Sequence, residues 1–209
     1  MKLKNIGKLS LLAIITAVIF AGCAGGQPTY INNQHPASAK AATLGLDYQD
    51  FRKASHDAVQ SMLKSGALNK PGGGRYVLAI SRIVNDTDQM IDMDQLTKSI
   101  RIALLQSGKV VVTTEFRAGG TTDEMTNEAR KLRNSDEVNQ KTVVKKGQLI
   151  GYDFSLSGKI IQRNSTLSNG ETRVDYYFQL TLTDTKTGLA YWEGETVISK
   201  AGSSKSVNW

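Results

Sequence analysis

Cys23 is the only cysteine in the 209-residue chain, and the residues before it point to one reaction at its thiol. The small residues Ala21 and Gly22 precede it, after a basic start and the apolar run 9–21. This is the order of a bacterial lipoprotein signal, in which a diacylglycerol thioether forms on the sulfur, the chain is cut before the cysteine and the new amine is acylated. Each buried lipid CH₂ contributes roughly 0.8 kcal/mol, so three acyl chains anchor a protein firmly. The sequence therefore predicts that Cys23 carries a lipid anchor and is not a nucleophile.

The residues on either side of this cysteine predict where the protein goes. Ala24 follows Cys23, where many lipoproteins retained in the inner membrane have Asp, so in a Gram-negative cell we expect an outer-membrane anchor facing the periplasm. Residues 1–22 are then the signal peptide. Residues 23–45 are mostly small and polar and are interpreted as a flexible tether. About 20 such residues reach roughly 70 Å when fully stretched.

The other residue types give little support for catalysis. Only two histidines occur, His35 in the tether and His56 in a helical pattern, and no second thiol exists that could bind zinc with them. Glu193 and Glu195 occupy alternate positions of one predicted strand and share a face. That spacing is possible for a glycosidase pair, but neighbouring acids on one face are more often solvated. We therefore predict no catalytic residues and no enzymatic activity.

Two further motifs resemble ligand-binding loops without meeting their requirements. A calcium-binding EF-hand needs Gly at its sixth position and Glu at its twelfth, and counted from Asp86 these are Ile91 and Thr97. The glycines of the segment 72–75 lack the Gly-Lys-Ser/Thr of a phosphate-binding loop and precede a strand instead of a helix. The sequence therefore predicts no metal ion and no cofactor.

Charge and length restrict the partners and the number of domains. The formal net charge is +7, and it falls to about +4 when the three lysines of residues 1–22 are removed. A mild positive charge spread over the chain, on a protein sent to the cell envelope, argues against binding of nucleic acid. Residues 46–209 contain no cysteine, so a hydrophobic core must hold them together, and we expect a single domain.

Helical periodicity dominates the first two thirds of this domain. We expect two amphipathic helices, from Asp47 to Gly66 and from 92 to 107, with strands at 76–84 and 109–114 between and after them. Ile100 and Leu104 should enter the core from the second helix. Two more helices are predicted, one opened by a capping box at 121–124 and carrying Met125, Ala129 and Leu132 on one face, and a weaker one at 136–146.

The last third has the alternation of β-strands. Residues 173–183 place Tyr176, Phe178, Leu180 and Leu182 on one face and polar residues on the other, which predicts a sheet with one open face. Strands at 154–161 and 189–199 flank it, and 184–188 is a hairpin loop. The expected fold is α+β, with a largely antiparallel sheet flanked by helices.

Three stretches in this order resemble one family, the LpoB family of penicillin-binding-protein activators. Residues 76–112 (YVLAISRIVNDTDQMIDMDQLTKSIRIALLQSGKVVV) are similar to its central strand, Asn-x-Thr turn and helix ending in Ser-Gly-Lys. The segment 151–158 (GYDFSLSG) resembles its "G-A-D-Y-x-L-x-G" strand, and 184–194 resembles its closing "T-G-x-x-x-W-x-G" hairpin, which also predicts that Trp192 is in the core.

This resemblance implies a fold like that of the N-terminal domain of TolB, and a protein that stimulates a bifunctional peptidoglycan synthase in the periplasm. We expect it to act by contact, and aromatic and Arg side chains dominate such contacts. The candidates are on the open face of the final hairpin and at its ends: Arg173, Tyr177, Tyr191 and Trp209. The alternative is a structural subunit of an outer-membrane or flagellar-type lipoprotein assembly or secretion complex, because the same fold occurs in the curli secretion lipoprotein CsgG.

Overall fold

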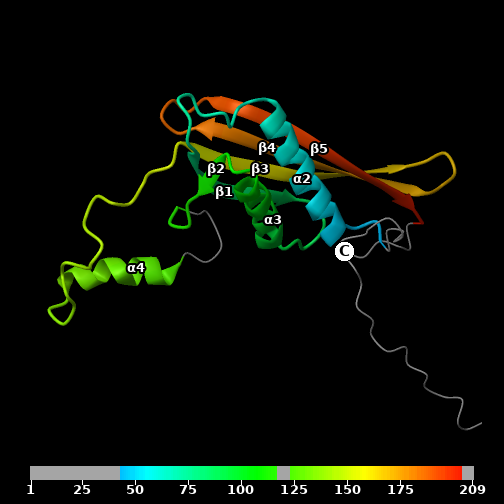
Figure 1. Ribbon diagram of the computed structural model, residues 1–209. Helices are drawn as coiled ribbons and strands as arrows, with labels where there is room; N and C mark the ends of the chain where they lie inside the picture. Colours follow the sequence, from blue (N-terminus) through cyan, green and yellow to red (C-terminus); the bar gives the residue numbers. More distant parts are fainter. Residues whose placement is uncertain (1–42, 117–122, 204–209) are drawn as a thin grey trace, which may run out of the picture. The chain divides into compact units, whose positions relative to one another are not determined.

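The computed structural model describes residues 43–116 and 123–203, which fold into a five-stranded sheet with two helices packed on one of its faces (Figure 1). The strand order is β2-β1-β3-β4-β5. The α+β class predicted from the sequence is confirmed. Cys23 and Trp209 lie outside the described residues.

Helices α2 (Tyr48–Lys64) and α3 (Met93–Gln106) begin and end where their capping residues require. Asp47 accepts hydrogen bonds from the backbone N–H groups of Gln49 and Asp50, and the Asp50 carboxylate accepts one from the N–H of Asp47, which completes a capping box. Asp92 caps α3, with one carboxylate oxygen accepting from the backbone N–H groups of Asp94 and Gln95. Both predicted helices are confirmed to within a few residues.

The sheet combines two parallel and two antiparallel ladders. Strand β1 (Tyr76–Asp86) pairs in parallel with β2 (Val110–Val112) and with β3 (Phe154–Thr166). Strands β4 (Thr172–Asp184) and β5 (Ala190–Gly202) continue the sheet as antiparallel hairpins. The two antiparallel ladders are the longer ones, so the sheet is largely antiparallel, as predicted.

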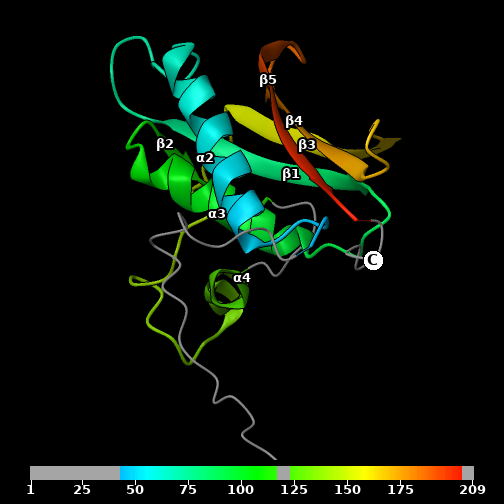
Figure 2. The same ribbon diagram turned by 90° about the vertical axis from the view of Figure 1, so that its right-hand side faces the viewer.

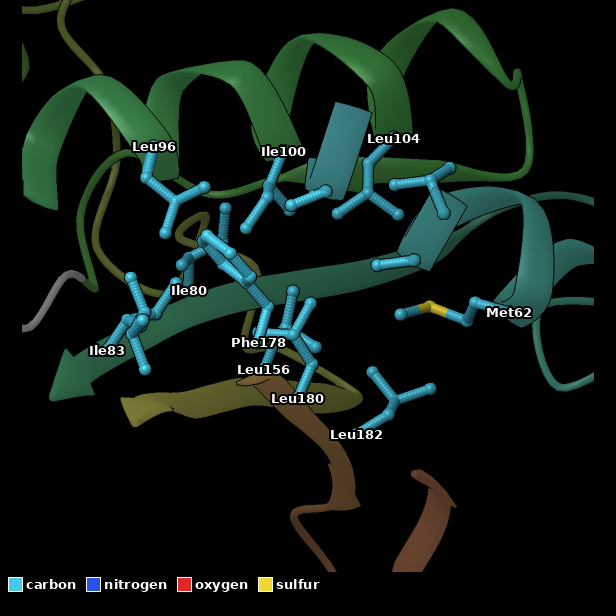
Figure 3. Close-up of a cluster of buried hydrophobic side chains, with 14 of the residues drawn as sticks. Met62, Ile80, Ile83, Leu96, Ile100, Leu104, Leu156, Phe178, Leu180 and Leu182 are labelled. Atoms are coloured by element: carbon cyan, nitrogen blue, oxygen red, sulfur yellow. The ribbon is translucent and has the colours of Figure 1, made fainter. Parts of the chain in front are cut away.

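The core lies between this sheet and the two helices (Figures 2 and 3). Leu96, Ile100 and Leu104 of α3 are buried there, as is Trp192 of β5. Along β4 the predicted set Tyr176, Phe178, Leu180 and Leu182 is buried, and Val174 is buried with it, while Asp175 of the opposite face is also buried. The cavity between helices and sheet measures about 10 Å³, near the lower limit for one water molecule, so this interior has no room for a substrate.

The region around α4 (Glu124–Lys131) departs from the prediction in two ways. Asp123 caps the helix, with its carboxylate accepting from the N–H of Met125, whereas the predicted capping box begins at Thr121, outside the described residues. The face of Met125, Ala129 and Leu132 is not buried: none of the α4 residues is, and Met125 is largely exposed.

The helix predicted at 136–146 is wrong, because this segment forms turns. Three consecutive β-branched residues, 142–144, disfavour a helix there. Side chains also hold the turns: Gln140 donates to the carbonyls of Leu132 and Ser135, and Arg133 donates to that of Val144. These bonds hold the segment against the end of α4.

Candidate docking surface

The residues that carry the family resemblance brace the fold. A Cβ added to Gly194 would lie 2.3 Å from the indole ring of Trp192, so the ring can lie flat along β5 only beside a glycine. A Cβ on Gly158 would lie 2.5 Å from the backbone oxygen of Gln179 on the neighbouring strand. Both glycines therefore have a structural role.

Polar motif residues also join elements instead of facing a ligand. The Asp153 carboxylate accepts a hydrogen bond of 2.9 Å from the backbone N–H of Val77, which ties the start of β3 to β1. At the end of β1, the Asn85 side chain donates to the carbonyl of Gln89 at 2.8 Å, and the Thr87 hydroxyl donates to Asn85 at 2.7 Å. These polar side chains therefore have a structural role, like the two glycines.

Three aromatic rings meet at the end of the sheet that contains the hairpin loop between β4 and β5. Tyr76 packs edge-on against Phe154 with ring centroids 4.8 Å apart, and Phe154 contacts Tyr191 at 5.0 Å. The Lys70 ammonium lies 5.0 Å from the Tyr76 ring centroid, in cation–π contact. Phe154 is buried, whereas Tyr191 is 53 % exposed. The inner rings thus support an aromatic residue that faces solvent.

Other large apolar side chains are exposed at the same end. Leu189 in the hairpin loop is 66 % exposed, and Tyr152 and Phe116, whose rings lie 5.3 Å apart, are 37 % and 38 % exposed. The Thr185 hydroxyl donates to the carbonyl of Tyr152 at 2.9 Å, which places this pair beside the hairpin loop. We name Phe116, Tyr152, Leu189 and Tyr191 the hairpin-end cluster.

The charged groups around this cluster include Lys70, Arg75 and Lys186 and the carboxylates of Asp153 and Asp184, with the Lys70 ammonium 3.5 Å from Asp153. The carboxylates of Asp153 and Asp184 are held by backbone N–H groups, from Val77 in one case and from Lys186 and Thr187 in the other. The Thr187 N–H keeps the pKa of Asp184 below its usual value. Arg75 and Lys186 are exposed at this end of the sheet.

The phenol of Tyr76 lies among these groups. Burial raises its pKa, and the nearby Tyr191, Asp153 and Asp184 raise it further. Tyr76 therefore stays neutral at physiological pH and keeps its O–H as a donor.

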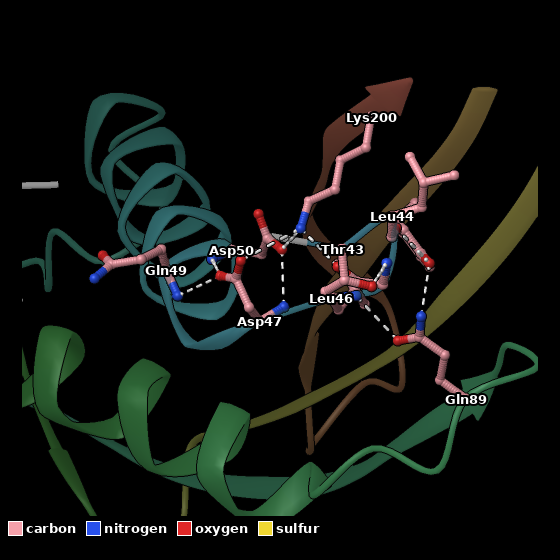
Figure 4. Close-up of polar contacts among 10 residues, drawn as sticks. Thr43, Leu44, Leu46, Asp47, Gln49, Asp50, Gln89 and Lys200 are labelled. Carbon is pink, nitrogen blue, oxygen red and sulfur yellow. Dashed lines mark hydrogen bonds and ion pairs between the residues drawn. The ribbon is translucent and has the colours of Figure 1, made fainter. Parts of the chain in front are cut away.

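The chain enters the domain at the other end of the sheet (Figures 1 and 4). Leu44 is buried, and its carbonyl accepts a hydrogen bond of 3.1 Å from the Tyr176 hydroxyl. The Leu46 N–H donates to the Gln89 side chain at 3.0 Å, and Lys200 donates to the carbonyl of Gly45 at 2.6 Å. Residues 43–45, which the sequence assigned to the tether, thus pack against the domain.

Burial raises the pKa of Tyr176 to about 12, so this hydroxyl remains a donor at any physiological pH. Its second bond, accepted from the Gln89 side-chain amide at 2.9 Å, completes the contact. The entry point of the chain is therefore fixed by buried hydrogen bonds.

The candidate contact residues predicted from the sequence are not brought together. Tyr177 and Arg173 lie on the sheet face opposite the helices, and the Arg173 guanidinium binds Asp175 at 3.0 Å. Tyr177 pairs with Val197 in the ladder, six residues along β5 from Tyr191, or about 20 Å at roughly 3.3 Å per residue. Sequence reasoning missed Phe116, Tyr152 and Leu189, whose neighbourhood depends on strand pairing.

The groups considered for chemistry have ordinary surroundings. Glu193 and Glu195 are exposed and accept hydrogen bonds from Thr181 and Gln179, and His56 is exposed on α2. Within residues 43–116 and 123–203, no group of three or more His, Cys, Asp or Glu side chains could hold a metal ion. None of the helices in these ranges has the length and apolar character needed to cross a membrane.

These observations define a small α+β domain with exposed apolar and aromatic side chains at the hairpin end of its sheet. The chain belongs to the LpoB family: the model of that family, described as peptidoglycan-synthase activator LpoB, matches residues 50–198. Family members are thus named as activators of a synthase, not as synthases.

Solved structures with a similar fold include the LpoB C-terminal domain from Escherichia coli, which is 18% identical. The match covers 72% of this chain and 99% of that one, with a TM-score of 0.41. The LpoB C-terminal domain from Salmonella enterica is 17% identical, and the match covers 71% of this chain and 98% of that one with a TM-score of 0.42. Lipoprotein GNA1162 from Neisseria meningitidis is 14% identical, and the match covers 64% of this chain and 87% of that one with a TM-score of 0.39. Comparison with curated proteins found no match.

Proposed function

We propose that this protein is a non-enzymatic periplasmic lipoprotein that binds a bifunctional peptidoglycan synthase, a class A penicillin-binding protein, and raises its activity. Membership of the family of peptidoglycan-synthase activators carries this proposal. The exposed aromatic side chains support it, because a protein that acts by contact needs such residues on its surface.

Activation by contact requires that the domain bind one state of the synthase more tightly than the other. A ligand with equal affinity for both states does not change their populations. Each tenfold difference in affinity between the two states contributes about 1.4 kcal/mol toward the state that is bound more tightly. The synthase supplies all catalytic groups in this mechanism, and the lipoprotein changes how much of the synthase is active.

Two surfaces carry the candidate contact residues. Arg173 and Tyr177 belong to the open face of the sheet, and Tyr191 belongs to the hairpin-end cluster. Trp209, outside the described residues, is the fourth candidate. The two surfaces are separate targets for substitution, since Tyr177 lies about 20 Å and Arg173 about 33 Å from Tyr191 along β5.

The lipid on Cys23 is proposed to hold the protein at the outer membrane. Replacing Cys23 with Ser removes the thiol that accepts the diacylglycerol. We expect the Cys23→Ser precursor to remain uncleaved or to be mislocalised when envelope fractions are separated by density. Normal processing and outer-membrane fractionation of this variant would contradict the anchor.

The activity itself is tested by adding the purified mature protein to purified cognate synthase and lipid II substrate. We expect faster glycan polymerisation, faster cross-linking, or both, with no activity from the lipoprotein alone. If neither rate changes with any class A synthase of the same cell, the proposed function is wrong.

A further inference from the structure

The two ends of the long antiparallel strands have different roles in this domain. At one end the chain from Cys23 enters through residues 43–47, held by Tyr176 and Lys200. At the other end lies the hairpin-end cluster. Lys200 pairs with Val174 in the ladder, and ten residues of β4 separate Val174 from Asp184 at the hairpin. At about 3.3 Å per residue, the entry point and the cluster are roughly 33 Å apart.

This separation matters for a protein anchored to one membrane. A coil of about 20 residues has a typical end-to-end distance of roughly 25 Å. A surface at the entry point reaches no farther than the tether, whereas a surface at the hairpin end gains the length of the strands. Of the two ends, the hairpin end is the one that lies farther along the domain from the point where the tether joins it.

We propose that the hairpin-end cluster is the surface that docks on the periplasmic part of the synthase, with the domain's long strands directed away from the lipid anchor. This inference rests on the proposed function and names its contact surface. The partner surface should be an apolar depression that receives Tyr191 and Leu189, bordered by carboxylates that meet Arg75 and Lys186.

The charges at this end favour such a partner over a second copy of the chain. Two copies meeting through their hairpin ends would bring Arg75 and Lys186 of each toward those of the other, while Asp153 pairs with Lys70 at 3.5 Å and leaves Asp184 to offset both cations. Like charges facing each other weaken association. A partner with acidic residues around an apolar centre meets both features of the cluster.

The test uses the mature protein and the full-length synthase, both in detergent. Leu189→Glu and Lys186→Glu change exposed loop positions, so the fold should be retained, and Tyr191→Ala removes the central ring. The matched control is Val197→Glu, which adds the same charge to the same strand at a 44 % exposed position of the open face. Thermal unfolding of each variant checks the fold.

We expect each of the three hairpin-end substitutions to weaken synthase binding at least tenfold and to reduce activation in parallel, while Val197→Glu binds as wild type. If wild type activates and the hairpin-end variants bind equally well, the docking surface is wrong and the proposed function stands. If Val197→Glu alone weakens binding, the open face is the contact surface and the inference is overturned.

Two more outcomes separate this inference from its alternatives. If wild type binds no synthase, the proposed function fails and the docking surface fails with it. If Leu189→Glu converts an oligomer of the lipoprotein to a monomer on sizing but leaves synthase binding unchanged, the cluster joins copies of this chain and the inference is wrong.

Discussion

The ammonium group of Lys200, near the end of β5, lies 2.5 Å from Oδ2 of Asp50 in the first turn of α2. Both side chains are largely buried, with 8 % and 13 % of their surface exposed. The same ammonium group binds the carbonyl of Gly45. One residue therefore joins the last strand, the first helix and the point where the chain enters the domain (Figure 4).

Replacing Lys200 with Met should destabilise the domain by about 3 kcal/mol at pH 7, because it leaves the buried carboxylate of Asp50 without its partner. The free energy of unfolding from urea titrations measures this change. The control is Lys53→Met, which removes an exposed i, i+4 pair with Asp57 on the same helix and should cost less than about 0.5 kcal/mol. Equal losses in the two variants would contradict the role of Lys200.

The loss in Lys200→Met should also depend on pH. Burial raises the pKa of Asp50, and the Lys200 hydrogen bond opposes this rise, so the pKa should rise further in the variant. A carboxyl whose folded-state pKa is raised favours folding below its unfolded value and loses this contribution as pH rises through the folded value. The deficit should therefore be small near pH 4 and full at pH 7. A deficit that does not change with pH would contradict this explanation.

Leu104 gives a direct test of the core. Its side chain is completely buried between α3 and the sheet, so Leu104→Ala should lower the free energy of unfolding by about 2 to 5 kcal/mol. Leu105, the next residue on α3, is 44 % exposed, and Leu105→Ala should change stability by less than about 0.5 kcal/mol. A smaller loss of stability for Leu104→Ala than for Leu105→Ala would show that the buried and exposed faces of α3 are assigned the wrong way round.

Asp175 should contribute to acid sensitivity. The Ser199 hydroxyl, and next Arg173, hold the pKa of Asp175 below its usual 3.8. Its contribution to stability is therefore present above about pH 4 and is lost as pH falls through the folded-state value. In Ser199→Ala the pKa should return toward 3.8, so less stability is lost between pH 4 and pH 2 than in wild type. Titration of the carboxyl carbon by NMR measures the shift directly, and an unchanged pKa would contradict the assignment.

The sequence predicted the elements whose patterns are local. The periodicity of 92–107 and the alternation of 173–183 identify the buried faces of α3 and β4, because each face is set by the geometry of a single element. The helix predicted at 136–146 was wrong for the opposite reason. The turns of this segment depend on bonds from Arg133 and Gln140 to backbone carbonyls, and periodicity contains no information about these bonds.

The hairpin-end cluster could not be predicted from the sequence, because its residues come together only through pairing between strands that are distant in the chain. Tyr191 was selected as an exposed aromatic residue of the last hairpin, but its neighbours Tyr76 and Phe154 are in β1 and β3. The pairings of Leu78 with Phe154 and of Phe154 with Asp184, together with the hairpin of β4 and β5, bring the three rings to one end of the sheet. The separation of Tyr177 from Tyr191 follows from the same register.

The tether provides the last prediction, because under the proposed function its reach limits contact with an inner-membrane synthase. About 20 residues at roughly 3.5 Å each cannot exceed about 70 Å. Deleting Asn32 to Ala41 halves this limit while leaving the residues from Thr43 onward, and their bonds to Tyr176 and Lys200, intact. The shortened protein should lose activation in cells and keep full activation of purified synthase in detergent.

Restoring length with an unrelated sequence is the control for this deletion. Ten Gly and Ser residues inserted in place of 32–41 should recover activity in cells, because only reach is required of this segment. Cell-wall incorporation of labelled precursor measures the effect. A subunit of an assembly at its own membrane should tolerate the deletion. Full activity of the shortened protein in cells would therefore favour that alternative. It would also remove the geometric argument for directing the hairpin end away from the anchor.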